Sequence, residues 1–158
     1  MMSRFLPIFI VVVLLSTPIT AAGKEPAKPG KRDRCPVCGM FVAPYPDWIA
    51  SLSFSDDSVL YFDGAKDLLR YYFSLPSKED SRTRADISDI YVTDYYSGQT
   101  VSAKHVFFIS GSDIYGPMGA ELIPVTGESA AASFFLDHKG QKMLRFEQLS
   151  KDHLPVEK

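Results

Sequence analysis

The chain has 158 residues, of which 46% are hydrophobic and 13% are aromatic, and its formal net charge is −2. This composition is typical of one folded domain with a sizeable core and excludes a disordered chain. The charge gives no sign of the basic surface that binds nucleic acid, so we expect no nucleic-acid partner. Function must therefore come from local groups of residues.

The N-terminus has the pattern of an export signal. Arg4 supplies a positive charge, residues 5–15 form an apolar run, and the Thr-Ala-Ala at 20–22 offers small residues for cleavage. We expect a signal peptide at 1–22 and a periplasmic mature protein. The run is shorter than the roughly 20 residues that span a bilayer, so retention as an anchor is the weaker alternative. No cysteine at the end of the segment offers a site for lipid attachment.

The rest of the chain divides into three parts. Residues 23–33 are rich in Gly, Pro and Lys and predict a flexible tether. Residues 34–149 hold the folded domain, and 150–158 form a polar tail.

Hydrophobic periodicity predicts, in chain order, strand 48–54, strand 59–62, helix 64–75, strand 90–93, strand 104–110, strand 121–125, helix 127–139 and strand 142–146. Asp63 and Thr126 are suited to cap the two helices, and the Gly-rich stretch 111–120 predicts a loop. The two halves repeat the order strand, strand, helix, strand. We therefore expect an α+β domain of two packed ββαβ units.

Both cysteines lie in one short motif, in which Cys35 and Cys38 are followed by Gly39 and Met40. Thiolate and thioether sulfurs select Cu(I), and thiolates also select Zn(II). Gly39 permits the tight turn that would aim Met40 at the same ion. Haem attachment is excluded because Gly39 replaces the required histidine, and a four-cysteine zinc site is excluded by the cysteine count. Metal binding is favoured, with a redox pair and an inert disulfide as alternatives.

Other ligands come from weaker signals. Met118 lies in the glycine-rich loop between Pro117 and Gly119, where it has no core face of its own, whereas Met143 alternates within a strand. Structural roles are favoured for the histidines, although His105 or His138 could complete the metal site.

The charges beside the motif also bear on its chemistry. Lys31, Arg32 and Arg34 are expected to favour the thiolate form. No nucleophile elbow, P-loop, dinucleotide fingerprint or HExxH motif is present, which argues against an enzyme. The rival hypothesis is a periplasmic thiol–disulfide oxidoreductase with Cys35 as nucleophile and Cys38 as resolving cysteine.

Five short motifs follow one another between residues 34 and 149: Cys-Pro-Val-Cys-Gly-Met at 35–40, Tyr-Phe-Asp-Gly at 61–64, Val-Thr-Asp-Tyr at 92–95, Ser-Gly-Ser at 110–112 and Pro-Met-Gly at 117–119. In this order they resemble the NosL family, the copper-binding accessory proteins of nitrous oxide reductase maturation. Many members are lipoproteins, whereas this chain lacks the lipid-attachment cysteine.

The resemblance implies two ββαβ-type units, distantly similar to a domain of organomercurial lyase. It implies an exported Cu(I) chaperone that works with a membrane ABC-type copper and sulfur maturation complex. The copper would pass to nitrous oxide reductase, an enzyme of denitrification, or to another exported copper enzyme. Carried over by motif, the ligands are Cys35, Cys38, Met40 and Met118.

Overall fold

The computed structural model describes residues 26–77 and 80–156. The signal peptide predicted at 1–22 and the beginning of the predicted tether lie outside these residues. Within the described ranges, no helix has the length and apolar character needed to cross a bilayer.

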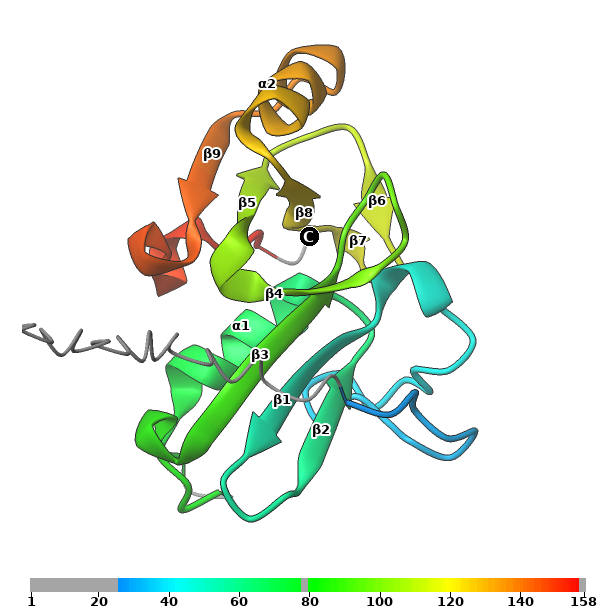
Figure 1. Cartoon of the computed structure of the whole chain (residues 1–158), viewed down its shortest axis with the longest axis vertical. Coiled ribbons are helices and arrows are strands. Elements are labelled where there is room, and N and C mark those ends of the chain that lie inside the picture. The colour runs from blue at the N-terminus through cyan, green and yellow to red at the C-terminus, as the bar shows by residue number, and fades with distance from the viewer. Residues whose placement is uncertain (1–25, 78–79, 157–158) are drawn as a thin grey trace, which may run out of the picture.

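The first structural unit is a four-stranded antiparallel sheet with one helix (Figure 1). Its elements are β1 (Ala50–Phe54), β2 (Val59–Phe62), α1 (Ala65–Ser74), β3 (Ile87–Thr93) and β4 (Thr100–Ser102). The strand order is β2-β1-β3-β4, and Leu52 of β1 faces Leu60 on one side and Ile90 on the other.

The second unit repeats this plan. Its elements are β5 (Val106–Ser110), β6 (Tyr115–Gly116), β7 (Gly119–Ala120), β8 (Ile123–Thr126), α2 (Glu128–Asp137) and β9 (Lys142–Arg145). In the order β8-β5-β9, strand β5 lies between β8 and β9, just as β1 lies between β2 and β3 in the first unit. The two predicted ββαβ units are therefore confirmed. Two short additions were not predicted, namely strand β4 and the β6–β7 hairpin.

One hydrophobic core joins the two units. Val106 and Phe108 of β5 pack in the same buried cluster as Leu68 and Leu69 of α1, and Leu122 of the second unit joins them. The alternate residues of β5 pack instead beneath α2. Strand β5 thus buries side chains on both faces, since successive strand residues point in opposite directions. Each large apolar side chain buried in this way contributes roughly 1.5–3 kcal/mol.

The helix starts differ from the predicted ones. Gly64 is the N-cap of α1 and Gly127 that of α2, and neither helix has a side-chain cap hydrogen bond. The predictions that Asp63 and Thr126 cap these helices are therefore wrong. Asp63 is instead buried, with its carboxylate turned toward the cysteine motif.

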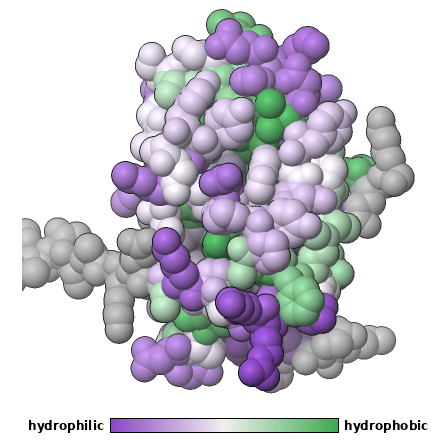
Figure 2. Space-filling view, turned by 90° about the vertical axis from the view of Figure 1, so that its right-hand side faces the viewer, coloured by the Kyte–Doolittle hydropathy of each residue, from purple (hydrophilic) through white to green (hydrophobic). Residues whose placement is uncertain are grey.

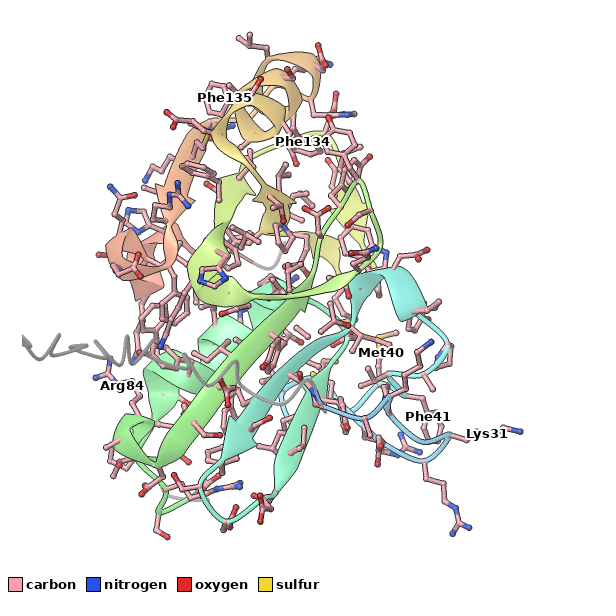
Figure 3. All side chains as sticks on the ribbon, in the orientation of Figure 1. Lys31, Met40, Phe41, Arg84, Phe134 and Phe135 are labelled. Carbon is pink, nitrogen blue, oxygen red and sulfur yellow. The ribbon has the colours of Figure 1, made fainter. Side chains whose placement is uncertain are left out.

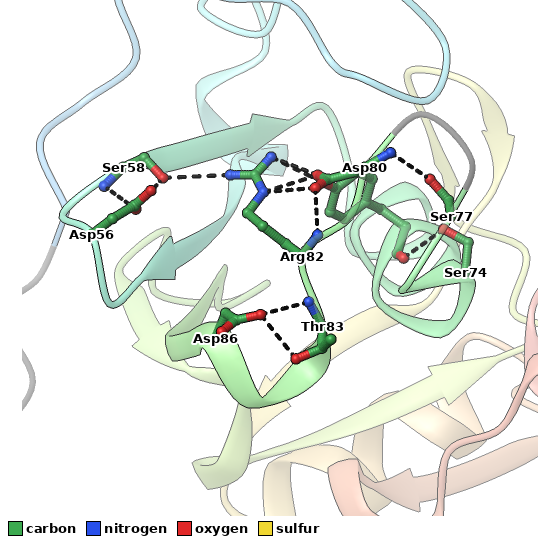
Figure 4. Close-up of polar contacts among 9 residues, drawn as sticks. Asp56, Ser58, Ser74, Ser77, Asp80, Arg82, Thr83 and Asp86 are labelled. Atoms are coloured by element: carbon green, nitrogen blue, oxygen red, sulfur yellow. Dashed lines mark hydrogen bonds and ion pairs between the residues drawn. The ribbon is translucent and has the colours of Figure 1, made fainter.

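A polar network holds the segment between α1 and β3 (Figure 4). Arg82 pairs with Asp80 at 2.6 Å, and Tyr71 of α1 donates a hydrogen bond to the same carboxylate. These hydrogen bonds hold the pKa of Asp80 well below its usual range, with Arg82 as the main cause. Thr83 and Asp86 close the adjoining turn. The network ties this segment to the end of α1.

Candidate metal centre

The cysteine motif folds into a tight turn that its own backbone closes. The Cys35 amide donates to the Met40 carbonyl at 2.9 Å, and the Gly39 amide donates to the Cys35 carbonyl at 2.8 Å. Gly39 has a φ of 78°, in the left-handed region that glycine adopts without strain. This confirms the expected role of Gly39 in the turn. The backbone N–H groups of Cys38 and Val37 act to lower the pKa of the Cys35 thiol, and that of Met40 acts to lower the pKa of the Cys38 thiol.

Two carboxylates complete a four-donor group with the cysteines. Asp67 lies in the first turn of α1, and Asp63 directly precedes the N-cap Gly64. The Cys35 thiol donates to Asp67 Oδ2 at 3.5 Å, and the Cys38 thiol donates to Asp63 Oδ1 at 3.3 Å. One donor atom from each residue lies within 4.8 Å of the other three. Among residues 26–77 and 80–156, no other group of three or more Cys, His, Asp or Glu side chains is so arranged.

The interior position of this group points to a cation. Cys35 is 1% exposed, and Asp63 and Asp67 are each 2% exposed. Asp63 Oδ2 is buried without any hydrogen-bond partner. An unsatisfied buried acceptor costs about 1–3 kcal/mol, and more when it is charged. A bound metal ion would satisfy that oxygen. The two sulfurs suit an ion that accepts soft ligands such as Cu(I), and Zn(II) accepts both sulfur and carboxylate oxygen.

The thiols themselves are protonated at neutral pH in the metal-free protein. Burial is the main cause, and it raises the pKa of Cys35 far above its ordinary value and that of Cys38 to about 11. Asp63 raises both values further through its hydrogen bonds and its negative charge, while the backbone N–H groups act in the opposite direction. Metal binding must therefore displace two thiol protons.

The basic residues beside the motif do not activate it. The Arg34 guanidinium donates to the Gly39 carbonyl at 2.8 Å and lies over the ring of Phe41, 3.7 Å from its centre. Lys31 points away from the globule (Figure 3). The prediction that these residues and Arg32 favour the thiolate is wrong, because burial and the Asp63 charge outweigh them at the sulfurs.

Met40 lies on the inner side of the turn, beside the strands of the first sheet (Figure 3). It is half-buried, and it shares with Cys38 a hollow at the protein surface. This hollow is lined by Arg34, Cys38, Gly39, Met40, Phe41, Pro44 and Tyr45. The half-buried Cys38 sulfur is thus reached from an open side, whereas Cys35 is enclosed.

Met118 lies at the tip of the β6–β7 hairpin and is 38% exposed. Its carbonyl accepts a hydrogen bond from Lys66 Nζ at 3.0 Å, and Lys66 is the neighbour of Asp67 in α1. The hairpin and the cysteine turn both lie on the right-hand side in Figure 1, the largely hydrophilic face that Figure 2 turns to the viewer. The backbone of Met118 is therefore placed beside the segment of α1 that carries Asp67. Its role as a ligand, like that of Met40, stays a prediction.

The histidines have other surroundings. His138 Nδ1 lies 3.2 Å from Asp113, His153 Nδ1 accepts from the Ser150 amide at 3.1 Å, and His105 is exposed. In the described ranges none of them belongs to the four-donor group. The two carboxylates were missed at the sequence level. Their spacing of four residues was the one available signal.

Comparisons with known proteins agree with the geometry. The family model NosL matches residues 26–154. The crystal structure of the copper chaperone NosL from Shewanella denitrificans has a TM-score of 0.70 and 20% sequence identity, covering 83% of this chain and 99% of that chain. The solution structure of the apo-NosL protein from Achromobacter cycloclastes has a TM-score of 0.47 and 25% identity, covering 68% and 91%.

The comparison with curated proteins gave no match. The likeness to the Shewanella protein establishes a common fold. Because the family model spans most of the described residues, the chain belongs to the NosL family.

Proposed function

We propose that the protein is an exported Cu(I)-binding metallochaperone. The observation that carries this proposal is the group of two cysteines and two aspartates, buried together with one carboxylate oxygen unpaired. Membership of the NosL family supports it, as does the shared fold with a protein described as a copper chaperone.

The proposed capture step exchanges protons for copper. In the metal-free protein the carboxylates accept hydrogen bonds from the thiols of Cys35 and Cys38. Cu(I) would bind as the thiols lose their protons, with Met40 and Met118 supplying thioether sulfur. Soft ligands of this kind prefer Cu(I) to harder ions. The half-exposed Cys38 and Met118 would leave the copper open to the ligands of a receiving protein.

The proposed delivery takes place in the periplasm. The apolar segment at 5–15 supports export, and the resemblance to the NosL family supports nitrous oxide reductase as the receiving enzyme. Another exported copper enzyme is the alternative. A membrane ABC-type maturation complex is the partner that the resemblance suggests for the copper supply.

The geometry disfavours the rival oxidoreductase. A cysteine nucleophile needs an accessible sulfur and a lowered pKa. Cys35 is 1% exposed, and burial raises the pKa values of both thiols. The motif is followed by a short 3-10 helix at Pro46–Trp48 and then by strand β1, so neither cysteine lies at the N-terminus of an α-helix that could stabilise a thiolate.

Anaerobic titration with Cu(I) tests the proposal. We expect about one Cu(I) per chain, as one soft-ligand site predicts. Replacing Cys35 and Cys38 together by Ser should abolish binding, because hydroxyl oxygen is a poor ligand for Cu(I). Met143→Leu is the matched control, since Met143 packs under α2 and should leave the affinity unchanged. Full affinity in the double serine variant would refute the assignment.

A further inference from the structure

Lys66 is an unusual residue to find in the interior. It belongs to α1 and is 2% exposed, although lysine is almost never fully buried without a partner. Its ammonium group donates to the backbone carbonyl of Met118 at 3.0 Å. The Lys66 ammonium group thus attaches the tip of the β6–β7 hairpin to α1.

Glu121 holds the other end of the same hairpin. It directly follows β7, and its Oε1 accepts hydrogen bonds from the amides of Lys66 at 2.6 Å and Leu122 at 2.8 Å. Glycines make room for it on both sides. A Cβ atom at Gly64 would lie 2.1 Å from Glu121 Oε2, and one at Gly116 would lie 3.2 Å from Glu121 Cγ. Glu121 is therefore packed between the start of α1 and the hairpin.

The residues of 63–67 divide between two tasks. Asp63 and Asp67 contact the thiols. Gly64 packs against Glu121, and Lys66 donates to the Met118 carbonyl of the hairpin. One turn of chain thus fixes the carboxylates and the Met118 backbone relative to each other. Small displacements of a ligand are costly because ligand orientation in metal sites depends on the surrounding contacts.

From this juxtaposition we infer that Lys66 and Glu121 are positioning residues that hold the Met118 sulfur in place for the copper. The inference rests on the proposed function and deepens it. Lys66 acts through the Met118 carbonyl and Glu121 through the Lys66 amide, and neither touches the metal. Without the ammonium group, the hairpin tip would lose its attachment to α1 while the cysteine turn would keep all its own contacts.

The three methionines at 40, 118 and 143 allow a direct test by NMR. With their methyl groups labelled with ¹³C, each gives its own signal, and Cu(I) is diamagnetic. In the full exported protein we expect Cu(I) to shift the signals of Met40 and Met118 and to leave Met143 unchanged. In Lys66→Leu the Met40 shift should persist and the Met118 shift should disappear. Cu(I) affinity should fall by about 10- to 100-fold, the usual effect of losing a supporting contact around a metal ligand.

Phe134→Leu is the matched control. Phe134 belongs to α2, is fully buried and packs with Phe107 and Ile109 of β5, so the variant loses stability without removing the contacts of Lys66 or Glu121. It should keep both methionine shifts. If Lys66→Leu does not fold, Lys66→Gln gives the same test, because its shorter, uncharged side chain lacks the ammonium group that donates to the Met118 carbonyl.

The outcomes separate the inference from the proposed function. A normal Met118 shift in the Lys66 variant, or its loss in Phe134→Leu as well, would overturn the positioning role. A wild-type protein in which Met40 responds and Met118 does not would also overturn it, yet would leave copper binding by the cysteines standing. No copper response at any methionine, together with no Cu(I) uptake in the titration, would remove the proposed function itself.

Discussion

Asp63 has a different task from the one that its sequence position suggests. An aspartate before an apolar helix is a favourable N-cap, but here its carboxylate accepts from the Cys38 thiol and keeps one oxygen unpaired. The helix start gains no side-chain cap in exchange. The helix loses the stabilisation that a side-chain cap would give, so we expect the Asp63 carboxylate to have a role at the cysteine thiols. This makes Asp63 the residue whose removal is most informative.

Asp63→Asn should lower the pKa of Cys38 in the metal-free protein. Asp63 raises that pKa through a hydrogen bond and through its charge, and the amide removes the charge. Burial, the largest cause, remains, so the value should fall from about 11 and stay above the ordinary 9.0. The thiolate absorbance measured against pH gives the value. Asp47→Asn, at an exposed position near the turn, is the control. An unchanged or higher pKa in Asp63→Asn would contradict this account.

At the scale of the element, the start of α1 shows why the Tyr-Phe-Asp-Gly motif has this order. Phe62 ends β2 in the core with no exposed surface, Asp63 turns to Cys38, and Gly64 leaves space for Glu121. Each of the three residues has a separate contact. Two of those contacts are with segments that lie far away in the sequence.

Gly64→Ala should destabilise the protein by about 1–3 kcal/mol, the usual cost of overpacking a filled interior. The φ of −177° is open to any residue, so the cost comes from the new Cβ, which would lie 2.1 Å from Glu121 Oε2. Glu121 cannot move aside without breaking its two amide hydrogen bonds. Urea denaturation measures the change in the free energy of unfolding.

Gly30→Ala is the control for that change. An added Cβ there would meet Asp33 Oδ2 at 3.6 Å, an ordinary contact, so stability should change little. Equal unfolding free energies for Gly64→Ala and the wild type would show that Glu121 is packed less closely against Gly64 than the structure indicates.

The elements divide into those that periodicity can predict and those that it cannot. Helical periodicity predicts one apolar face of α1 with Ala65, Leu68, Leu69 and Tyr72, of which the first three are buried and Tyr72 is half-buried. Lys66 and Asp67 are buried as well, through contacts with the hairpin and the cysteine turn that no local pattern contains. Strands β6 and β7 have two residues each, too few for a period to be seen. The cysteine motif was found from sequence because its signal is local, whereas its carboxylates were not.

At the scale of the whole molecule, the candidate site depends on both units. Cys35 packs in the cluster that contains Phe108 and Leu122 of the second unit, and the hairpin carrying Met118 is clamped to α1 of the first. The two units thus share a topology but contribute different parts of the candidate site. The first unit presents carboxylates at the start of its helix, and the second inserts a hairpin between its first two strands. Glu121 and Lys66 are both buried ionisable residues at this junction.

Glu121 makes the stability of the whole protein depend on pH. Burial is the main cause that raises its pKa to about 8, and Asp67 adds to the effect, while the amides of Leu122 and Lys66 and the charge of Lys66 oppose it. The folded protein therefore binds more protons at Glu121 than the unfolded chain does between the model value of 4.5 and about 8. Unfolding free energy should fall as pH rises through this window, by up to about 1.4 kcal/mol per pH unit, and level off above it.

Glu121→Gln should remove that slope, because the amide keeps the Oε1 acceptor for both backbone N–H groups and does not titrate. The carboxylates with lowered pKa values, such as Asp94 and Asp113, lose their stabilising contribution only when the pH falls further, and the Cys38 and Tyr71 pKa values lie at about 11 and about 12. The window thus isolates Glu121 among these groups. Urea denaturation of both proteins at about pH 5 and about pH 8 measures the difference. A wild type whose unfolding free energy is the same at the two pH values would mean that Glu121 ionises in the folded protein as readily as in the unfolded chain, and the junction between the units would then have to be open to water.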